Sequence, residues 1–352
     1  MENLLYPQKY LCKEEEDFKF NKNIIKKIIK FAEKGKLPHI IFHGDYGSGK
    51  LSIILYFLKI LLKTDKVYNR NSIPFTTSDG NNEWTINIIK SPYYFELDAA
   101  DFGYNDKKIL SSFISEICKN VNVITNKYNI IIIKNAENLS IDAQYTFRRI
   151  MEKNFKSCRI IFSTHNTALI DESIISRCIM FRIPSPKNKE LYDYLSNICD
   201  NESIPYNSPD LKEIVIRSKR NINISLLLLQ ISYKNGVYEK VTFNQELFLE
   251  SVIEEIQDYK NYKPLVIRNK IYLMLLHNIS IHEFMEKLIQ NIFENQTIDL
   301  NFNQKKKIIR SALYYNKTSN MGYRNIYHME TFVNFLVLIL HGIDVKEKFD
   351  NL

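Results

Sequence analysis

Glycines and a lysine crowd together between a short apolar run and a long helical pattern. Gly44, Gly49 and Lys50 have the spacing G-x-x-x-x-G-K, and Gly47 lies between them. In this spacing, backbone N–H groups and a helix N-terminus face an anion, while the lysine reaches the outer phosphates of a nucleotide. The sequence therefore predicts a nucleotide-phosphate loop formed by Gly44, Asp45, Tyr46, Gly47, Ser48, Gly49, Lys50, Leu51 and Ser52.

The residue after that lysine should be serine or threonine, because its hydroxyl holds a magnesium ion in such loops. Here it is Leu51. Ser52 follows one residue late, about 100° further round the helix. The loop therefore keeps the groups that hold phosphate but lacks the one that holds the metal.

A second buried strand should supply the remaining metal chemistry of a nucleotide hydrolase. Such enzymes need an Asp for the metal's water shell and an acidic residue that orients the attacking water. The strand Ile130 to Ile133 ends instead in Lys134 and Asn135. Glu137 would lie about 10 Å further along a strand, too far to serve the same ion. A lysine about 4 Å from a divalent ion costs ~8 kcal/mol, so we expect neither Mg²⁺ nor hydrolysis in this chain's own site.

Arg177 stands between Ser176 and Cys178, just before an apolar run. Its guanidinium is planar and always charged, which suits binding to the phosphate of another molecule. Taken alone, however, an arginine near the start of a strand is more often a surface residue or a salt-bridge partner. The residue by itself leaves both interpretations open.

The elements that would position these residues follow an alternating pattern. A strand at Ile40 to Phe42 precedes the loop, and a helix at Lys50 to Leu62 follows it. The other predicted elements are strands at Tyr93 to Leu97, Asn129 to Ile133, Arg159 to Ser163 and Ile179 to Ile183, and helices at Asn21 to Lys34, Asn105 to Lys119 and Ser140 to Lys153. This alternation predicts an α/β fold whose parallel sheet is covered by helices on both faces.

Two regions depart from that pattern. Residues 64 to 92 are polar and are predicted to be irregular. After Pro184 and Pro186 we expect only helices, at Lys187 to Cys199, Asp210 to Arg217, Ile222 to Tyr233, Glu246 to Tyr259, Pro264 to His277, Ile281 to Glu294 and Thr331 to His341. The predicted domains are an α/β domain at residues 1–183, a helical lid at 184–240 and a larger helical domain at 241–352.

Composition bounds the class of protein. The 352 residues carry a formal net charge of +8, which mildly favours binding to polyanions such as nucleic acid. The 5 cysteines are scattered and nowhere in C-x-x-C spacing, so they predict neither a disulfide framework nor a zinc site. Neither a signal peptide nor a membrane-spanning run is apparent, so we expect a soluble intracellular protein. The run Lys305 to Lys307 could be a DNA-binding patch, but a solvated helix face is the favoured prediction.

Four features follow one another along the chain. They are the phosphate loop, the buried strand Ile130 to Ile133, the segment Asp142 to Lys153 and the tripeptide Ser176 to Cys178. Together they resemble the small subunits of replication factor C, the eukaryotic-type sliding-clamp loader within the AAA+ superfamily. The helical segment is similar to the family's D-A-Q-x-x-x-R-R-x-M-E, and S-R-C is its signature tripeptide. The resemblance covers residues 20 to 235. Beyond residue 240 it extends only to the helical architecture, which implies a collar domain.

Within that family, the chain most resembles the member with G-K-x-[ST] in place of G-K-[ST], which holds a nucleotide without hydrolysing it. The segment Gly49 to Ser52 fits that variant. The family's polar sensor aligns with His165, next to Asn166, and its arginine sensor aligns with Asn223. Its N-terminal motif is represented only by Tyr6 to Leu11. The resemblance implies a degenerate ATPase that holds ATP or ADP unhydrolysed, or stays empty.

The resemblance also assigns roles to basic residues. The family's S-R-C arginine reaches the γ-phosphate of a neighbouring subunit's ATP, so Arg177 is expected to be such a finger. One of Arg148 and Arg149 would meet the neighbour's nucleotide site, unless both belong to a solvated face. Lys107 and Lys108 stand where the family presents N–H groups and basic side chains to duplex phosphates, although two ordinary surface lysines are as consistent with the sequence.

These expectations combine into one function. We expect a non-catalytic small subunit of a pentameric clamp loader, which helps to grip a ring-shaped sliding clamp and primer-template DNA without sequence preference. The alternatives are a self-sufficient AAA+ ATPase with unusual metal ligands and a pure scaffold subunit with a vestigial nucleotide site. The expected location is the nucleus of a eukaryotic cell, or the replication compartment of a host cell if the source is a large DNA virus.

Overall fold

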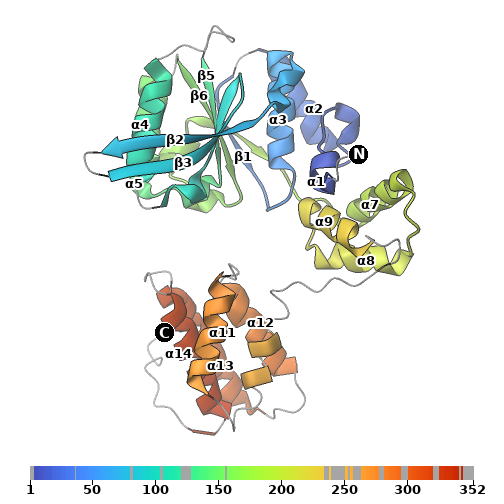
Figure 1. Cartoon of the computed structure of the whole chain (residues 1–352), viewed down its shortest axis with the longest axis vertical. Coiled ribbons are helices and arrows are strands. Elements are labelled where there is room, and N and C mark those ends of the chain that lie inside the picture. The colour runs from blue at the N-terminus through green and yellow to red at the C-terminus, as the bar shows by residue number, and fades with distance from the viewer. Residues whose placement is uncertain are drawn as a thin grey trace. The chain divides into compact units, whose positions relative to one another are not determined.

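In the computed structural model, the apolar runs of the N-terminal half join into one seven-stranded sheet (Figure 1). The strands lie in the order β2-β3-β4-β5-β6-β1-β7, and β4, β5, β6, β1 and β7 run parallel to one another. The bounds of these five are β1 His39–His43, β4 Tyr94–Asp98, β5 Asn129–Lys134, β6 Cys158–Thr164 and β7 Cys178–Arg182. The predicted α/β fold with a parallel sheet is confirmed.

The structure describes residues 4–35, 37–79, 82–103, 106–119, 128–154, 157–233, 238, 250–252, 254–256, 263–276, 281–294, 300–319, 325–340 and 342–343. The chain divides into two compact units, Met1–Glu239 and Lys240–Leu352. The first unit contains the sheet together with the helices that follow it up to residue 232. The predicted division into three domains, with borders after residues 183 and 240, stays a prediction.

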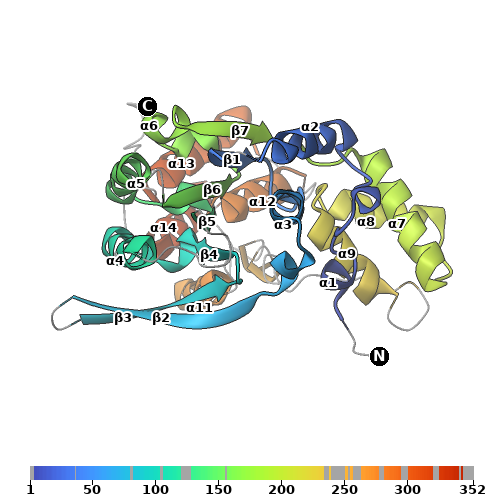
Figure 2. The same cartoon turned by 90° about the horizontal axis from the view of Figure 1, so that it is seen from above.

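Helices cover both faces of the sheet because the strands alternate apolar side chains to both sides. On one face, Ile130 and Ile132 of β5 pack with α2 (Lys22–Glu33) and α3 (Lys50–Leu62). On the other face, Ile131 and Ile133 pack with α4 (Asp106–Lys119) and α5 (Ile141–Lys153). Figure 2 shows the strands between these two layers of helices.

The expectation that residues 64 to 92 are irregular is wrong. They contain a short helix, η2 Asp65–Tyr68, and a long antiparallel hairpin of β2 Asn71–Asp79 and β3 Asn82–Lys90, which extends the sheet beside β4. Pro74 is tolerated because β2 is the outermost strand, where a missing N–H leaves no neighbouring strand without a donor. Ile86 and Ile88 of β3 are buried, so a period-two pattern was present among the polar residues.

Short elements connect the layers of the first unit. They are α1 Tyr6–Lys9, η1 Glu15–Asp17, η3 Ala99–Asp101, η5 Ala136–Asn138, η6 Thr167–Leu169 and α6 Glu172–Ile175. Asp171 caps the start of α6, since its side chain accepts a hydrogen bond from the Ser173 N–H at 2.7 Å. This cap fixes the chain just before Arg177.

Three helices follow the last strand and form what we call the lid. They are α7 Asn188–Glu202, α8 Ser208–Arg217 and α9 Ile222–Ser232. Asn221 is the N-cap of α9, and its side-chain oxygen accepts from the Ile224 N–H at 3.2 Å. The predicted lid helices are confirmed, with α7 and α8 shifted by a few residues.

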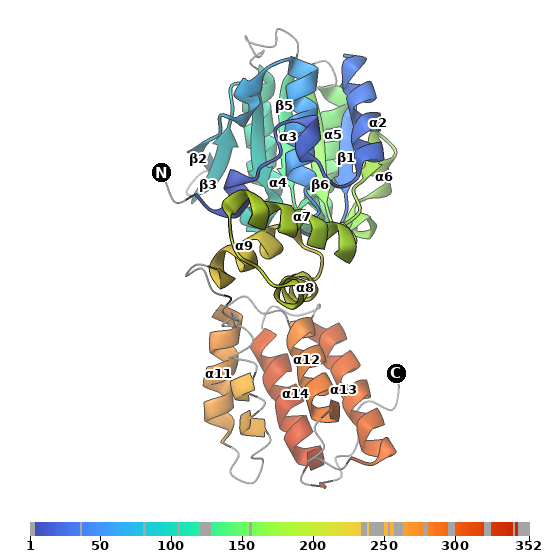
Figure 3. The same ribbon diagram turned by 90° about the vertical axis from the view of Figure 1, so that its right-hand side faces the viewer.

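The second unit is helical where it is described, and its helices lie side by side as a bundle (Figure 3). Their bounds are α11 Pro264–Leu276, α12 Ile281–Glu294, α13 Phe302–Ser319 and α14 Asn325–Leu340. Of the helix predicted at Glu246 to Tyr259, residues 250–252 and 254–256 are helical and the others lie outside the described residues, as does His341. Lys305, Lys306 and Lys307 lie on α13.

None of the helices in the described part of the chain has both the length and the apolar character needed to cross a bilayer.

Candidate functional site

The phosphate loop begins where β1 ends and closes onto the first turn of α3. Gly47 has a φ of 68° and Gly49, the N-cap of α3, has a φ of 85°, a conformation that favours glycine. A Cβ on Gly44 would lie 1.9 Å from the carbonyl oxygen of Ile183. The three glycines of the predicted loop are therefore needed by its backbone conformation and close packing, and α3 begins at Lys50 as predicted.

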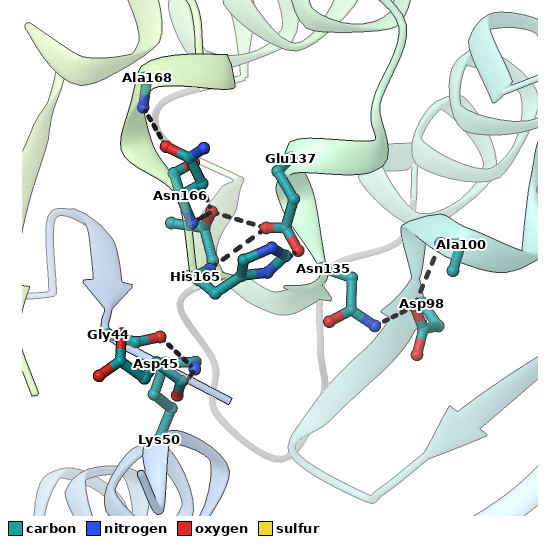
Figure 4. A network of polar contacts seen from close by, with 11 residues as sticks. Gly44, Asp45, Lys50, Asp98, Ala100, Asn135, Glu137, His165, Asn166 and Ala168 are labelled. Atoms are coloured by element: carbon teal, nitrogen blue, oxygen red, sulfur yellow. Dashed lines mark hydrogen bonds and ion pairs between the residues drawn. The ribbon is translucent and has the colours of Figure 1, made fainter. Parts of the chain in front are cut away.

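Lys50 is turned onto its own loop (Figure 4). Its Nζ donates to the carbonyl oxygen of Gly44 at 2.6 Å and to that of Asp45 at 2.7 Å. Burial lowers the pKa of this amine, while the nearby carboxylates of Glu137 and Asp45 act in the opposite direction. A bound phosphate would replace carbonyl acceptors that the amine already has.

The lid contacts the phosphate loop directly. The Ile222 N–H, at the start of α9, donates to the Gly47 carbonyl oxygen at 3.1 Å. A Cβ on Gly47 would lie 1.8 Å from Asn221 Oδ1. Ser185 Oγ donates to Asp45 Oδ2 at 3.0 Å. The loop is therefore enclosed between β1, α3 and the lid.

A cavity of about 60 Å³ lies beside the loop, between the N-terminal segment and the lid. Pro7, Tyr10 and Leu11 line it from the N-terminal side, and Ser52 and Asn223 line it from α3 and α9. The N-terminal segment is tied to the lid, because the Tyr6 N–H donates to Gln230 Oε1 at 2.8 Å and Lys9 Nζ lies 2.5 Å from Glu202 Oε1. The short N-terminal motif thus lies beside the phosphate loop and forms one wall of this cavity.

The residues at the two metal positions do not fit a divalent cation. Leu51 packs against the apolar cluster under α2 and α3, and Ser52 lines the cavity. Lys134 Nζ lies 3.2 Å from Glu96 Oε1 and 3.4 Å from Asp98 Oδ2. Nowhere in the described residues do three or more His, Cys, Asp or Glu side chains gather in a way that could hold a metal ion.

The chain turns sharply after β5, so the distance argument made for Glu137 from a continuing strand is wrong. Asn135 has a φ of 49°, and Ala136–Asn138 form the short helix η5. The Asn135 amide donates to Asp98 Oδ1 at 2.8 Å. This turn brings Glu137 back toward the phosphate loop, close enough for its charge to act on the pKa of Lys50.

Glu137, His165 and Tyr46 form a cluster over the loop that the sequence did not predict as a unit. Glu137 is buried, and its Oε2 accepts from Thr164 Oγ1 at 2.6 Å and from the His165 N–H at 3.3 Å. Its other oxygen contacts His165 Nδ1. The His165 ring lies against the Tyr46 ring, with centroids 3.9 Å apart. Desolvation first, and then the charges of Glu137 and Asp98, raise the pKa of Tyr46.

The two positions aligned with the family's sensors differ in what they contact. His165, at the first position, belongs to the cluster with Glu137 and Tyr46. Its neighbour Asn166 caps η6 by accepting from the Ala168 N–H at 2.9 Å. Asn223, at the second sensor position, is exposed and lines the cavity beside the loop. The sequence singled out Glu137 and His165 separately, but nothing in it indicated that they meet Tyr46 in one cluster.

Arg177 lies on the surface of the first unit, just after α6. Its Nη1 donates to the Ser173 carbonyl oxygen at 2.8 Å, and its Nη2 lies 2.7 Å from Glu152 Oε1 of α5. Arg148 shares that carboxylate, with Nε 3.4 Å from the same oxygen. The structure therefore brings Arg177 and Arg148 together at Glu152, while Arg149 is exposed on the same helix.

The remaining predicted contact residues lie at the start of α4. Lys107 and Lys108 are exposed, and Lys107 Nζ lies 3.2 Å from Asp142 Oδ2 at the start of α5. The two helix starts are joined by Asp106, which accepts from the Ser140 N–H at 2.7 Å and from Ser140 Oγ at 3.0 Å. Both lysines are thus held at one end of the layer formed by α4 and α5.

Comparison with family models matches two parts of the chain. Residues 20–187 match the model described as DNA polymerase III, delta subunit. Residues 246–343 match the model described as replication factor C subunit 3, C-terminal domain. One match covers the phosphate loop and the sheet, and the other covers the helices of the second unit.

Curated relatives match the chain over most of its length. Replication factor C subunit 3 of Arabidopsis thaliana is 26% identical over 344 residues, covering 94% of this chain and 96% of the relative. Subunit 5 of Saccharomyces cerevisiae is 26% identical, covering 84% and 88%. Subunit 3 of Homo sapiens is 25% identical and covers 85% of each chain. Among solved structures, a RuvB mutant of Thermotoga maritima superposes with a TM-score of 0.45 at 12% identity, covering 96% and 93%.

Proposed function

Because the chain belongs to the family of replication factor C small subunits, we propose that it is a clamp-loader subunit that does not hydrolyse ATP itself. In this proposal its own phosphate loop holds a nucleotide structurally, and Arg177 acts at the ATP site of a neighbouring subunit. The observation that carries the proposal is a contrast between two places. At the position where a metal ligand is expected, Lys134 forms ion pairs with Glu96 and Asp98. Arg177, in contrast, lies on the surface in an exposed ion pair.

The loop has groups suited to phosphate, whereas Leu51 and Lys134 offer no oxygen ligand at the two positions where a metal ligand is expected. Gly47 and Gly49 keep the conformation of the loop, and Lys50 lies at it. Ser48 Oγ is buried and has no hydrogen-bond partner in the described part of the chain, so a phosphate oxygen would satisfy it. ATP or ADP would therefore be held without hydrolysis, and Mg²⁺ has no ligand set at Leu51 and Lys134. An empty loop is the other state consistent with this proposal.

The surface position of Arg177 supports a role in trans. Its ion pair with Glu152 joins side chains that are 34% and 48% exposed, and such pairs contribute only about 0–1 kcal/mol. An arginine finger supplied in trans accelerates hydrolysis by about 10³ to 10⁵. The guanidinium can therefore leave Glu152 for a neighbour's γ-phosphate at small cost. Arg148, on the same carboxylate, and exposed Arg149 would lie at that same interface.

The partners in this proposal are the other clamp-loader subunits in a pentamer, a sliding clamp and primer-template DNA. Lys107 and Lys108 would contact the DNA backbone, because they lie at a helix N-terminus and phosphate contacts carry no sequence preference. The helices of the second unit would form the collar that joins the subunits. The protein would act in the nucleus, or in the host's replication compartment if it is viral.

Hydrolysis by the purified chain separates this proposal from its enzymatic rival. The chain alone, with ATP, Mg²⁺ and primer-template DNA, should release phosphate no faster than its Lys50→Met variant. Turnover by the chain that Lys50→Met abolishes would favour a self-sufficient ATPase with unusual metal ligands. In the scaffold alternative the phosphate loop is vestigial and Arg177 contacts no neighbour, so that alternative is tested through Arg177 in the assembled complex.

A further inference from the structure

Glu96 is a buried carboxylate on β4, opposite Ile132 near the end of β5. The side chain of Glu96, on β4, is 0% exposed. Arg70 Nη2 donates to both of its oxygens, at 2.7 and 2.6 Å, and Lys134 Nζ lies 3.2 Å from Oε1. A buried carboxylate is stable only when it is paired, and removing a partner from such a pair is strongly destabilising. Lys134 is therefore a partly exposed partner of a buried carboxylate.

Asp98 joins both residues that stand in place of the expected acidic pair. It lies opposite Lys134 in the parallel ladder, and Lys134 Nζ lies 3.4 Å from its Oδ2. The Asn135 amide donates to its Oδ1 at 2.8 Å, and that same oxygen accepts from the Ala100 N–H at 3.1 Å. Lys134 and Asn135, which stand where carboxylates are expected, thus form a connected polar network with β4.

The ammonium of Lys134 lies on the face of the sheet that carries the phosphate helix. Alternation along β5 puts Lys134 on the same side as Ile130 and Ile132, which pack with α3. The first turn of α3 carries Lys50 and Leu51. A metal-binding site of this kind would draw ligands from positions 51 and 134, and at position 134 the side chain is a lysine in place of a carboxylate.

We propose that Lys134 is a built-in counter-ion for Glu96 and Asp98 and that the phosphate loop, as a result, binds a nucleotide without a divalent cation. This inference rests on the proposed function in one respect, namely that the loop holds a nucleotide. Lys134, paired with Glu96 and Asp98, offers no oxygen ligand to a divalent ion, and the phosphates are met by Lys50 and by the N–H groups at the start of α3.

The network also prevents simple restoration of catalysis. Lys134→Asp would put a third carboxylate beside Glu96 and Asp98, and among the described residues it would leave Arg70, on Glu96, as the paired cation. Like charges at such distances oppose folding unless one of them takes up a proton. We therefore expect that returning an acidic residue to this position destabilises the protein and does not create a hydrolase.

Nucleotide binding with and without metal tests the proposal on the unmodified full-length chain. The probe is a methylanthraniloyl-labelled ADP, titrated by fluorescence anisotropy with excess Mg²⁺ and with excess EDTA. We expect dissociation constants that agree within about twofold, and Lys50→Met should abolish binding in both conditions. A loss of affinity of about tenfold or more in EDTA, or no binding in either condition, would overturn the proposal.

Thermal unfolding of variants tests the counter-ion role separately. Lys134→Met should lower the melting temperature by about 6 to 12 °C, and Lys134→Asp by more. Lys153→Met, at an exposed position on α5, is the control and should leave it unchanged. A Lys134→Asp protein as stable as the parent, or one that hydrolyses ATP with Mg²⁺, would refute the role. Neither experiment involves Arg177 or a second subunit, so their outcome is independent of the proposed arginine finger.

Discussion

The guanidinium of Arg177 lies 2.7 Å from the carboxylate of Glu152, measured from Nη2 to Oε1, on the surface of the first unit. Glu152 also receives Arg148 from the preceding turn of α5. The carboxylate thus holds Arg177 together with Arg148, which is one of the two α5 arginines considered for contact with a neighbouring subunit. Because the pair is largely exposed, it positions Arg177 without binding it tightly.

Glu152→Gln should leave the neighbour's ATP hydrolysis unchanged or raise it by up to about fivefold, because it removes a competing ion pair of about 0–1 kcal/mol. The measurement is phosphate release by the assembled complex in the presence of clamp and DNA. Glu172→Gln, an exposed glutamate on α6, serves as the control. A large loss of hydrolysis in Glu152→Gln alone would mean that the carboxylate, rather than the arginine, is needed at the interface.

His39 makes the stability of the first unit depend on pH. It is buried at the start of β1, and its Nδ1 accepts from the Ile160 N–H at 3.1 Å, which requires that nitrogen to be unprotonated. Burial first, and then the charge of Arg159, lower its pKa from 6.5 to about 4. Since the folded pKa is the lower one, stability is complete above pH 6.5 and is lost as the pH falls toward 4.

The loss should reach about 3 kcal/mol at pH 4, or about 1.4 kcal/mol per pH unit. Urea unfolding at pH 7 and pH 5 measures it. His39→Asn keeps an acceptor oxygen but does not titrate, so its free energy of unfolding should fall less between these two pH values than that of the parent. An equal fall in both proteins would show that His39 is not the titrating group.

Gly47→Ala should destabilise the contact between the phosphate loop and the lid. The new Cβ would meet Asn221 Oδ1 at 1.8 Å, and the φ of 68° costs a non-glycine residue about 1–2 kcal/mol. Gly35→Ala is a matched control, because its φ is 66° and nothing lies within 4 Å of the added Cβ. We expect Gly47→Ala to lower the free energy of unfolding by more than Gly35→Ala.

A double variant separates strain from collision at this contact. Asn221→Ala removes the colliding side chain together with the cap of α9, so Asn221→Ala alone is the reference. In that background the added cost of Gly47→Ala should fall to that of Gly35→Ala, which leaves the backbone strain. If Gly47→Ala and Gly35→Ala cost the same, the lid does not press on the loop in solution.

Lys107 and Lys108 should contribute to DNA affinity through the phosphate backbone. Each phosphate contact contributes about 0.9 to the slope of log K against log salt, so replacing both lysines with glutamine should reduce the slope by about 1.8. The measurement is binding of the assembled complex to primer-template DNA at several salt concentrations. Lys305→Gln with Lys306→Gln, on α13, is the control pair and should leave the slope unchanged.

The parallel part of the fold could be predicted because its signals are local. The isoleucines of β5 form a run buried on both faces, and the glycine loop fixes where α3 begins. The hairpin of β2 and β3 was missed because its outer strand carries polar residues and Pro74, which an edge strand tolerates and a central one does not.

The candidate site was predictable only in part. Leu51 and Lys134 could be recognised as departures because a spacing rule names those positions. What Lys134 does instead could not be read from the sequence, because Asp98 and Glu96 lie on another strand and meet it only through sheet pairing. The sequence likewise gave no sign of the left-handed turn at Asn135, so the position of Glu137 near the phosphate loop could not be predicted.

Replacement of Arg177 with alanine in the assembled complex tests the account most directly. The complex should contain one active ATP site, that of the neighbour proposed to receive Arg177, with the others silenced through their phosphate-loop lysines. Arg177→Ala should reduce hydrolysis at that site by about 10³-fold or more, Arg177→Lys should not restore it, and a lid control, Arg217→Ala, should have no effect. Clamp-stimulated hydrolysis that is unchanged in a fully assembled Arg177→Ala complex would contradict the account and favour a scaffold subunit.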